Sequence, residues 1–246
     1  QEVITNATVL RIQQQLEKND AGYRKLPGTE LKNDKTGEVV YTPPQNPDRV
    51  VNLMNNLIEY LNDDELQTFD PVIKMAIIHH QFESIHPFYD GNGRTGRILN
   101  ILYLVAKGLI DLPVLYLSRY IIQNKNDYYR LLQQVRDTGD WGDWILFILE
   151  GVETVSLQSI ELIKAIKELM QRYKYHIRKE YKFYSQDLLN NLFHHPYTKI
   201  EFLQKELKVS RQSASKYLNE LVDDPLGILM KIKIGRDYFF VNQKLM

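Results

Sequence analysis

The spacing of apolar residues predicts a mainly helical chain up to about residue 180. Residues 7–18 and 48–62 repeat apolar side chains every three or four positions, the pattern of a helix with one buried face. Residues 72–85 are apolar on nearly every side, which indicates a central, buried helix. A further apolar helix is expected from Arg94 to Lys107, where Gly108 ends it. Other helices are predicted at 118–123, 126–137, 141–150 and 152–180.

Two regions depart from this pattern. Residues 27–47 are rich in Pro and Gly, and within them 30–32 and 38–41 flank a polar turn, which predicts a β-hairpin. The last 60 or so residues predict two short helices followed by two strands around Gly235-Arg236, the order of a winged helix. These elements are Lys199–Leu207, Ser210–Val222, Gly227–Ile234 and Asp237–Val241.

Composition narrows the class of protein. The chain has no cysteine, so disulfides and thiolate metal sites are excluded. No apolar run approaches the roughly 18 residues of a membrane span, and we expect no membrane association and a cytoplasmic location. The net charge is +0, which does not favour a nucleic-acid partner for the whole chain.

One loop, from His86 to Arg97, gathers the residue types that bind phosphate and act on it. It reads His-Pro-Phe-Tyr-Asp-Gly-Asn-Gly-Arg-Thr-Gly-Arg and leads into a predicted helix. The glycines let backbone N–H groups approach an anion, which the helix dipole also favours. Arg94 and Arg97 lie on one helix face and can each bind phosphate oxygens through two hydrogen bonds. Asp90 is placed to hold a divalent cation, and His86 to accept the proton of an attacking hydroxyl.

The loop is similar at every defined position to the motif of the Fic family, His-x-Phe-x-Asp/Glu-Gly-Asn-Gly-Arg-x-x-Arg. The resemblance to bacterial Fic proteins with a C-terminal winged helix covers nearly the whole chain. Its other supporting stretches are Tyr23–Gly28, Val40–Pro44, His80–Ile85, Leu115–Arg119 and Asp127–Tyr129. It implies a mainly α fold: a Fic-type helical bundle over residues 1–183, with a β-hairpin flap at about 29–42, followed by a small winged helix-turn-helix domain over 184–246.

The same resemblance implies a protein adenylyltransferase, which moves AMP from ATP to a Ser, Thr or Tyr hydroxyl of a target protein and of itself. His86 would be the general base, Asp90 would hold Mg²⁺, and Phe88 would anchor the loop in the core. Arg94 would bind the β-phosphate and Arg97 the γ-phosphate. The remaining implied nucleotide contacts are Gly91, Asn92 and Gly93 in the anion hole, Thr95 and Gly96 beside them, and Tyr129 in preference to Tyr128 at the adenine.

The hairpin ending at Val39–Thr42, with Val40 and Tyr41, would be the flap that aligns the protein substrate by backbone pairing. Fic proteins of this type usually carry an inhibitory Ser/Thr-x-x-x-Glu-Gly/Asn helix whose Glu pairs with the second motif arginine. No Ser or Thr here is followed by Glu four residues later. Our hypothesis is that this helix lies upstream of residue 1, so that Arg97 is unpaired and the fragment is de-repressed.

Other interpretations stay open at this point. His79, His80, Trp141 and Trp144 are expected to be structural, the Tyr128-Tyr129 pair can equally be core packing, and 194–196 is expected to be a linker. The winged helix can bind DNA, protein or a second copy, and a homodimer is common among relatives. Residues 185–246 hold nine Lys or Arg against seven Asp or Glu, which is little positive charge for a DNA reader. The rival functions are a nucleotide-sensing DNA-binding regulator, phosphocholine transfer, phosphorylation and de-AMPylation.

Overall fold

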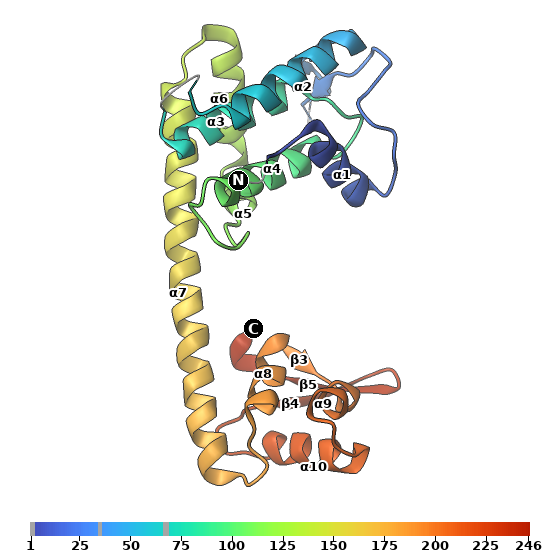
Figure 1. Cartoon of the computed structure of the whole chain (residues 1–246), viewed down its shortest axis with the longest axis vertical. Helices are drawn as coiled ribbons and strands as arrows, with labels where there is room; N and C mark the ends of the chain where they lie inside the picture. The colour runs from blue at the N-terminus through green and yellow to red at the C-terminus, as the bar shows by residue number, and fades with distance from the viewer. Residues whose placement is uncertain (1–2, 34–35, 66–68) are drawn as a thin grey trace. The chain divides into compact units, whose positions relative to one another are not determined.

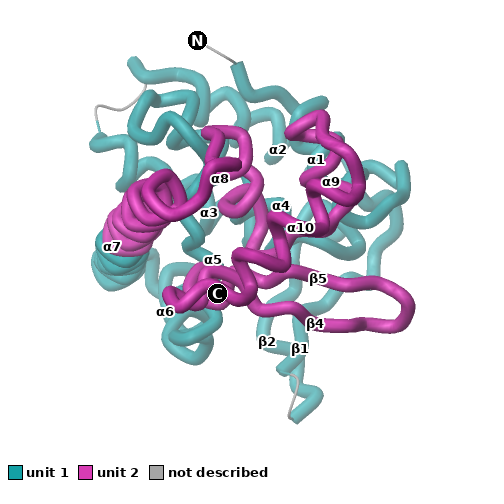
Figure 2. The backbone as a smooth tube through the Cα atoms, turned by 90° about the horizontal axis from the view of Figure 1, so that it is seen from below, with its two compact units in different colours: residues 1–159 teal, residues 160–246 magenta. Residues whose placement is uncertain are grey.

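The computed structural model describes residues 3–33, 36–65 and 69–246. The chain forms two compact units, 1–159 and 160–246 (Figure 2). The division falls within one helix, α7 (Gly142–Glu180). The final part of α7 belongs to the second unit because Tyr173 and Ile177 are fully buried in that unit's core. The predicted domain boundary at residue 183 falls just after the end of the same helix and stays a prediction.

The first unit is mainly helical, as predicted, and Figure 1 shows its helices in blue to yellow-green. Its helices besides α7 are α1 (Asn6–Glu17), α2 (Pro47–Asn62), α3 (Pro71–Ile85), α4 (Asn92–Ala106), α5 (Leu117–Gln123) and α6 (Lys125–Thr138). Three of them begin where the sequence provides a cap: Thr5, Asn46 and Asp70 each accept a backbone N–H with the side chain. Pro follows the cap in α2 and α3, where its missing N–H has no cost.

Helix α3 is the centre of the first core. Its buried residues come from every side of the helix, which is why its apolar pattern has no polar face. Trp144 of α7 is fully buried against α3 and donates its indole N–H to the carbonyl of Ala76 at 2.9 Å. Trp141 packs on the same core at its edge. The expectation that both tryptophans are structural is confirmed.

The predicted hairpin is present as β1 (Leu31–Lys32) and β2 (Val39–Tyr41). The strands are antiparallel, with Leu31 opposite Tyr41 and Lys32 opposite Val39, and a bulge lies between the two pairs. Part of the predicted turn, residues 34–35, lies outside the described residues.

Residues 141–150 and 152–180 were expected to form two helices, and this expectation is wrong, because α7 is continuous across Gly151. A Cβ at Gly151 would lie 2.7 Å from the Tyr120 ring and 3.0 Å from Leu117. The glycine therefore permits α5 to pack closely on α7 and does not end the helix.

The second unit contains the helix, helix, hairpin order that the sequence predicts. Its elements are α8 (Gln186–His194), β3 (Tyr197–Thr198), α9 (Ile200–Leu207), α10 (Arg211–Val222), β4 (Met230–Ile234), β5 (Asp237–Val241) and the 3-10 turn η1 (Gln243–Leu245). The sheet order is β3-β5-β4, all antiparallel. Sequence reasoning missed α8 and β3: the expected linker at 194–196 instead connects them, and the Pro196 carbonyl accepts the N–H of Asn242.

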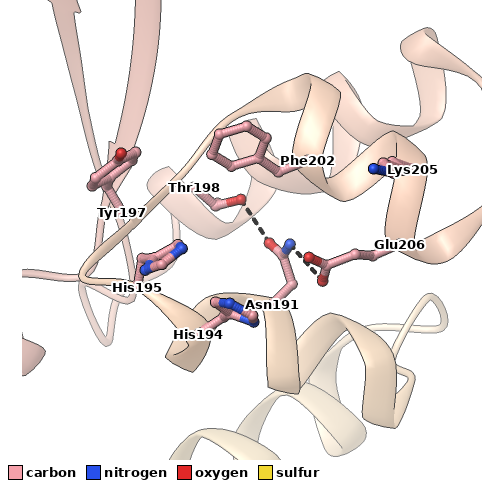
Figure 3. Close-up of a pocket in the computed structure, with 8 residues that line it drawn as sticks. All are labelled: Asn191, His194, His195, Tyr197, Thr198, Phe202, Lys205 and Glu206. Atoms are coloured by element: carbon pink, nitrogen blue, oxygen red, sulfur yellow. Dashed lines mark hydrogen bonds between the residues drawn. The ribbon is translucent and has the colours of Figure 1, made fainter. Parts of the chain in front are cut away.

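A shallow hollow in the second unit lies between α8, β3 and α9 (Figure 3). Asn191 bridges its base by accepting from the Thr198 hydroxyl at 2.7 Å and donating to Glu206 at 2.8 Å. The hollow measures about 200 Å³, less than the ~300–1,000 Å³ of typical small-molecule sites. These polar side chains satisfy one another, so they hold the unit together and leave no demand for a ligand.

Candidate active site

The loop between α3 and α4 is shaped by two residues with positive φ. His86 ends α3 in the left-handed region, at φ 49° and ψ 60°. Gly91 begins α4 in the same region, at φ 80°. A non-glycine residue in this region costs about 1–2 kcal/mol, so the conformation of His86 must be imposed by its neighbours. The loop therefore leaves one helix end, reverses and enters the next within a few residues.

Asn92 closes the loop from inside. Its side-chain oxygen accepts the backbone N–H of Phe88 at 2.9 Å, and its side-chain amide donates to the Phe88 carbonyl at 2.8 Å. Phe88 is fully buried, with its ring 5.3 Å from that of Tyr23, and so anchors the loop in the core as expected. Because the Asn92 side chain is used up in this way, only its backbone can serve an anion hole.

The His86 imidazole is a neutral base in its surroundings. Burial, together with the positive charges of Arg24 and Arg136, lowers its pKa to about 4, although a hydrogen bond with the Glu83 backbone and the charge of Asp90 oppose the fall. The ring is therefore unprotonated near pH 7. Its Nδ1 atom is buried, so Nε2 is the nitrogen that can meet a substrate hydroxyl. A neutral imidazole at a loop edge can accept a proton.

The N-terminus of α4 has no side-chain cap. Its cap is Gly91, which has no side chain to satisfy the first N–H groups of the helix. The Asp90 carboxylate accepts the N–H of Gly91 at 2.6 Å and so lies at this helix end. A Cβ at Gly93 would lie 3.0 Å from Nη1 of Arg97, so the Arg97 guanidinium lies over the glycine. Backbone N–H groups and a guanidinium thus meet at one helix end, an arrangement that binds phosphate.

The two motif arginines differ in their partners. Arg94 is half exposed and donates to Oε1 of Glu17, the last residue of α1, at 2.5 Å. The same carboxylate lies over the proposed anion site, since a Cβ at Gly91 would clash with Oε1 of Glu17. Arg97 makes no ion pair with any residue that the structure describes, although its charge acts on the buried Glu83 carboxyl. Sequence reasoning missed Glu17 because it belongs to no motif and reaches the loop only through the packing of α1 on α4.

Other predicted nucleotide contacts are buried. Thr95 has no exposed surface, and Gly96 is also buried. A Cβ at Gly96 would lie 2.9 Å from both Glu83 Oε1 and the Phe82 ring, so the glycine permits α4 to approach α3 closely. Burial raises the pKa of the Glu83 carboxyl to about 7, although the charges of Arg97 and Arg136 oppose the rise. Neither Thr95 nor Gly96 offers surface to a ligand.

The expected adenine contact and its alternative occupy different surroundings. Tyr129 is 55% exposed, whereas Tyr128 is buried and its hydroxyl lies 2.9 Å from Nε2 of His79. Tyr128 is therefore part of the core, and Tyr129 is the one of the pair that a ligand can reach. His79 and His80 are buried, and His80 lies 3.1 Å from the Leu132 carbonyl, so both are structural as expected.

Two arginines near His86, Arg24 and Arg136, had no role assigned from the sequence. Arg136 of α6 donates to the Ser84 hydroxyl at 3.0 Å and lies 3.7 Å over the ring of Tyr41 in the flap. The Tyr41 hydroxyl donates to the Ser84 carbonyl at 2.9 Å, so the base of β2 is fixed to α3. Val40, by contrast, is 47% exposed and free to contact a partner. Arg24 stood within one of the stretches that support the family resemblance, but nothing in that stretch indicated its role.

No cluster of three or more potential metal ligands occurs in the part of the chain that the structure describes. A single carboxylate, Asp90, still suits Mg²⁺, which keeps several waters and binds substrate phosphates. The described helices also include none long and apolar enough to cross a bilayer.

Comparison with known proteins gives a family match within each unit. The Fic/DOC family profile matches residues 3–104, and that of the C-terminal domain of SoFic-like protein adenylyltransferases matches 169–245. A probable protein adenylyltransferase of Aquifex aeolicus is 36% identical over 121 residues, 49% of this chain and 36% of the relative. Protein adenylyltransferase fic-1 of Caenorhabditis elegans is 38% identical over 73 residues, 29% of this chain and 14% of the relative. The chain therefore spans 36% or less of the length of these two curated relatives.

Solved structures support the fold. A Fic family protein from Desulfovibrio desulfuricans has a TM-score of 0.57 at 21% identity, covering 98% of this chain and 70% of that one. The Fic-1 structure of C. elegans has a TM-score of 0.50 at 25% identity, covering 65% of this chain and 44% of that one.

Proposed function

We propose that this chain, which belongs to the Fic/DOC family, transfers AMP from ATP to a hydroxyl of a protein substrate. The observation that carries the proposal is the meeting of a neutral imidazole, an uncapped helix N-terminus and two arginines in one short loop. The names of its relatives, protein adenylyltransferases, support the same activity.

The reaction follows from this arrangement. The triphosphate of ATP lies against the N-terminus of α4, where Arg97 and Arg94 neutralise its negative charge. The substrate hydroxyl gives its proton to Nε2 of His86 as its oxygen bonds to the α-phosphorus. The bond from that phosphorus to the oxygen shared with the β-phosphate breaks, and pyrophosphate leaves. Asp90 would hold Mg²⁺, which would supply charge neutralisation at the phosphates.

Glu17 must move when ATP binds. Its carboxylate lies over Gly91 and pairs with Arg94. A phosphate at the same place would meet a like charge, so Glu17 has to release Arg94 and turn away when ATP binds. Arg94 therefore exchanges a carboxylate for a phosphate, whereas Arg97 has no ion pair with a described residue to give up.

The flap offers an edge for the protein substrate. β1 and β2 form a two-stranded sheet whose outer residues Val39 and Val40 are each 47% exposed. An extended segment of the substrate would pair with a strand edge of this kind and bring its hydroxyl to His86.

The test uses ATP labelled at either the α- or the γ-phosphate, with Mg²⁺ and a cell lysate, and also the purified chain alone to detect self-modification. We expect label on protein from α-labelled ATP and none from γ-labelled ATP. Label from γ-labelled ATP alone would mean phosphorylation, and no label from either would refute the proposal.

A further inference from the structure

The Arg24 guanidinium is buried and bonds only to carbonyl groups. Arg24 is 1% exposed. Its Nε donates to the His86 carbonyl at 2.9 Å, and its Nη2 donates to the carbonyls of Ile85, at 3.4 Å, and Pro44. No carboxylate pairs with it among the described residues. Burying a charge without a counter-ion is energetically costly. The fold must therefore hold these carbonyl groups where the guanidinium can donate to them.

The bonds converge on the strained residue of the loop. His86 has a φ of 49° although it carries a side chain. Arg24 holds the carbonyl of His86 with its side chain and the carbonyl of the next residue, Pro87, with its own backbone N–H at 2.9 Å. Fixing the carbonyls on both sides of the turn fixes the direction in which the His86 imidazole leaves the backbone.

The same short segment also touches the flap and the rest of the loop. Pro44, whose carbonyl accepts from Arg24, follows β2 by only three residues. The backbone N–H groups of Lys25 and Leu26 donate to the Tyr89 hydroxyl at 2.9 and 3.0 Å. The segment from Arg24 to Leu26 therefore joins the exit of the flap to both ends of the turn that carries His86.

We propose that Arg24 is a positioning residue, which clamps the exit of the flap to the backbone of His86 and so aims the imidazole at the substrate hydroxyl. This role rests on the proposed AMP transfer for its kinetic consequence. Its structural consequence, the setting of His86, is independent of that reaction.

The charge of Arg24 adds a second, measurable effect. The charged groups that face His86 are Arg24, Arg136 and Asp90. Burial and the two arginines keep the pKa of His86 low, at about 4, and a hydrogen bond with the Glu83 backbone and the charge of Asp90 oppose them. Removing the charge of Arg24 should therefore let the pKa of His86 rise toward 6.5, whereas removing only its forked geometry should not.

Two variants separate geometry from charge. Arg24→Lys keeps the charge but cannot reach three carbonyls with one planar group, and Arg24→Met removes both. Arg49→Met is the matched control, because Arg49 is an exposed arginine of the same unit whose side chain has no hydrogen bond or ion pair with the described residues. Tryptophan fluorescence checks that each variant is folded. NMR titration of the imidazole gives the pKa of His86, with His86→Gln to assign the signal, and calorimetry gives the Kd for ATP.

We expect kcat to fall about 10–100-fold in Arg24→Lys, since misplacement of a reacting group by about 1 Å can cost that much. The Kd for ATP should stay within about twofold, because phosphate binds at α4. The pKa of His86 should rise in Arg24→Met and stay low in Arg24→Lys. If Arg24→Met does not fold, Arg24→Lys alone decides the matter through kcat against Kd.

An unchanged kcat in Arg24→Lys together with an unchanged His86 pKa in Arg24→Met would overturn the proposal. So would an equal loss of ATP affinity and kcat in Arg24→Lys, which is the behaviour of a loosened fold. If the wild-type chain transfers no AMP while the His86 titration moves as expected, the proposed function fails, and the electrostatic contact of Arg24 with His86 stands.

Discussion

The change Asn92→Ala should show how the proposed catalytic loop between α3 and α4 is held closed. The Asn92 side chain makes two hydrogen bonds, both to the backbone of Phe88, at 2.9 and 2.8 Å. Alanine removes both and leaves the N–H and carbonyl of a fully buried residue without partners. A buried polar group left unpaired costs about 1–3 kcal/mol, so the first unit should lose about 2–4 kcal/mol of stability.

The assay is urea unfolding followed by tryptophan fluorescence. Both tryptophans of the chain, Trp141 and Trp144, lie in the first unit, so this signal reports on that unit alone. That separation matters because a chain of two units need not unfold in one step. Asn52→Ala is the matched control, since Asn52 is exposed on α2 and its side chain has no hydrogen bond among the described residues.

Asn92→Asp sharpens the test. It keeps the acceptor for the Phe88 N–H but faces the Phe88 carbonyl with a second oxygen instead of a donor. We expect it to be at least as unstable as Asn92→Ala at pH 7 and less so under mild acid, where a protonated carboxyl can donate. A loss of stability in Asn92→Ala no larger than in Asn52→Ala would refute the view that these two bonds hold the loop.

The remaining predictions concern the base, the exchange at Arg94 and pH. His86→Ala should lower AMP transfer by about 10²–10⁴-fold while ATP binding by calorimetry is unchanged; full transfer would rule out His86 as the base. Glu17→Gln should bind ATP up to about fivefold more tightly, the scale of a partly exposed ion pair, with adenosine binding unchanged. Its control is Glu59→Gln, because Glu59 is exposed and its side chain has no hydrogen bond or ion pair among the described residues. Equal ATP affinities of Glu17→Gln and the wild type would contradict the exchange at Arg94. Burial lowers the pKa of His79 to about 3 and the pKa of His80 and His86 to about 4. The folded chain therefore takes up protons less readily than the unfolded chain, so the stability present above pH 6.5 is lost as the pH falls toward these folded-state values. Each histidine should lower the free energy of unfolding by about 2 kcal/mol at pH 5. Urea midpoints that do not fall between pH 7 and 5 would contradict this.

Much of the fold followed from local chemistry. Three helices start at caps that bond to residues two or three positions further along: Thr5, Asn46-Pro47 and Asp70-Pro71. The helix boundaries therefore lie close to their predicted positions. Gly151 misled the prediction because a glycine that ends a helix and one that admits a neighbouring helix read alike in sequence. Only the packing of Tyr120 shows which of the two it is.

The same division holds for the active site. The sequence alone identified the loop from His86 to Arg97, because its residues are adjacent along the chain and their chemistry is evident from their spacing. Glu17 and Arg24 were not identifiable, because they lie more than sixty residues from the groups they bind. Nothing local marks a glutamate that reaches Arg94 or an arginine that holds the His86 carbonyl. Their effects depend on distance in space and on burial, and both are decided only when α1 and the segment after it pack against the loop.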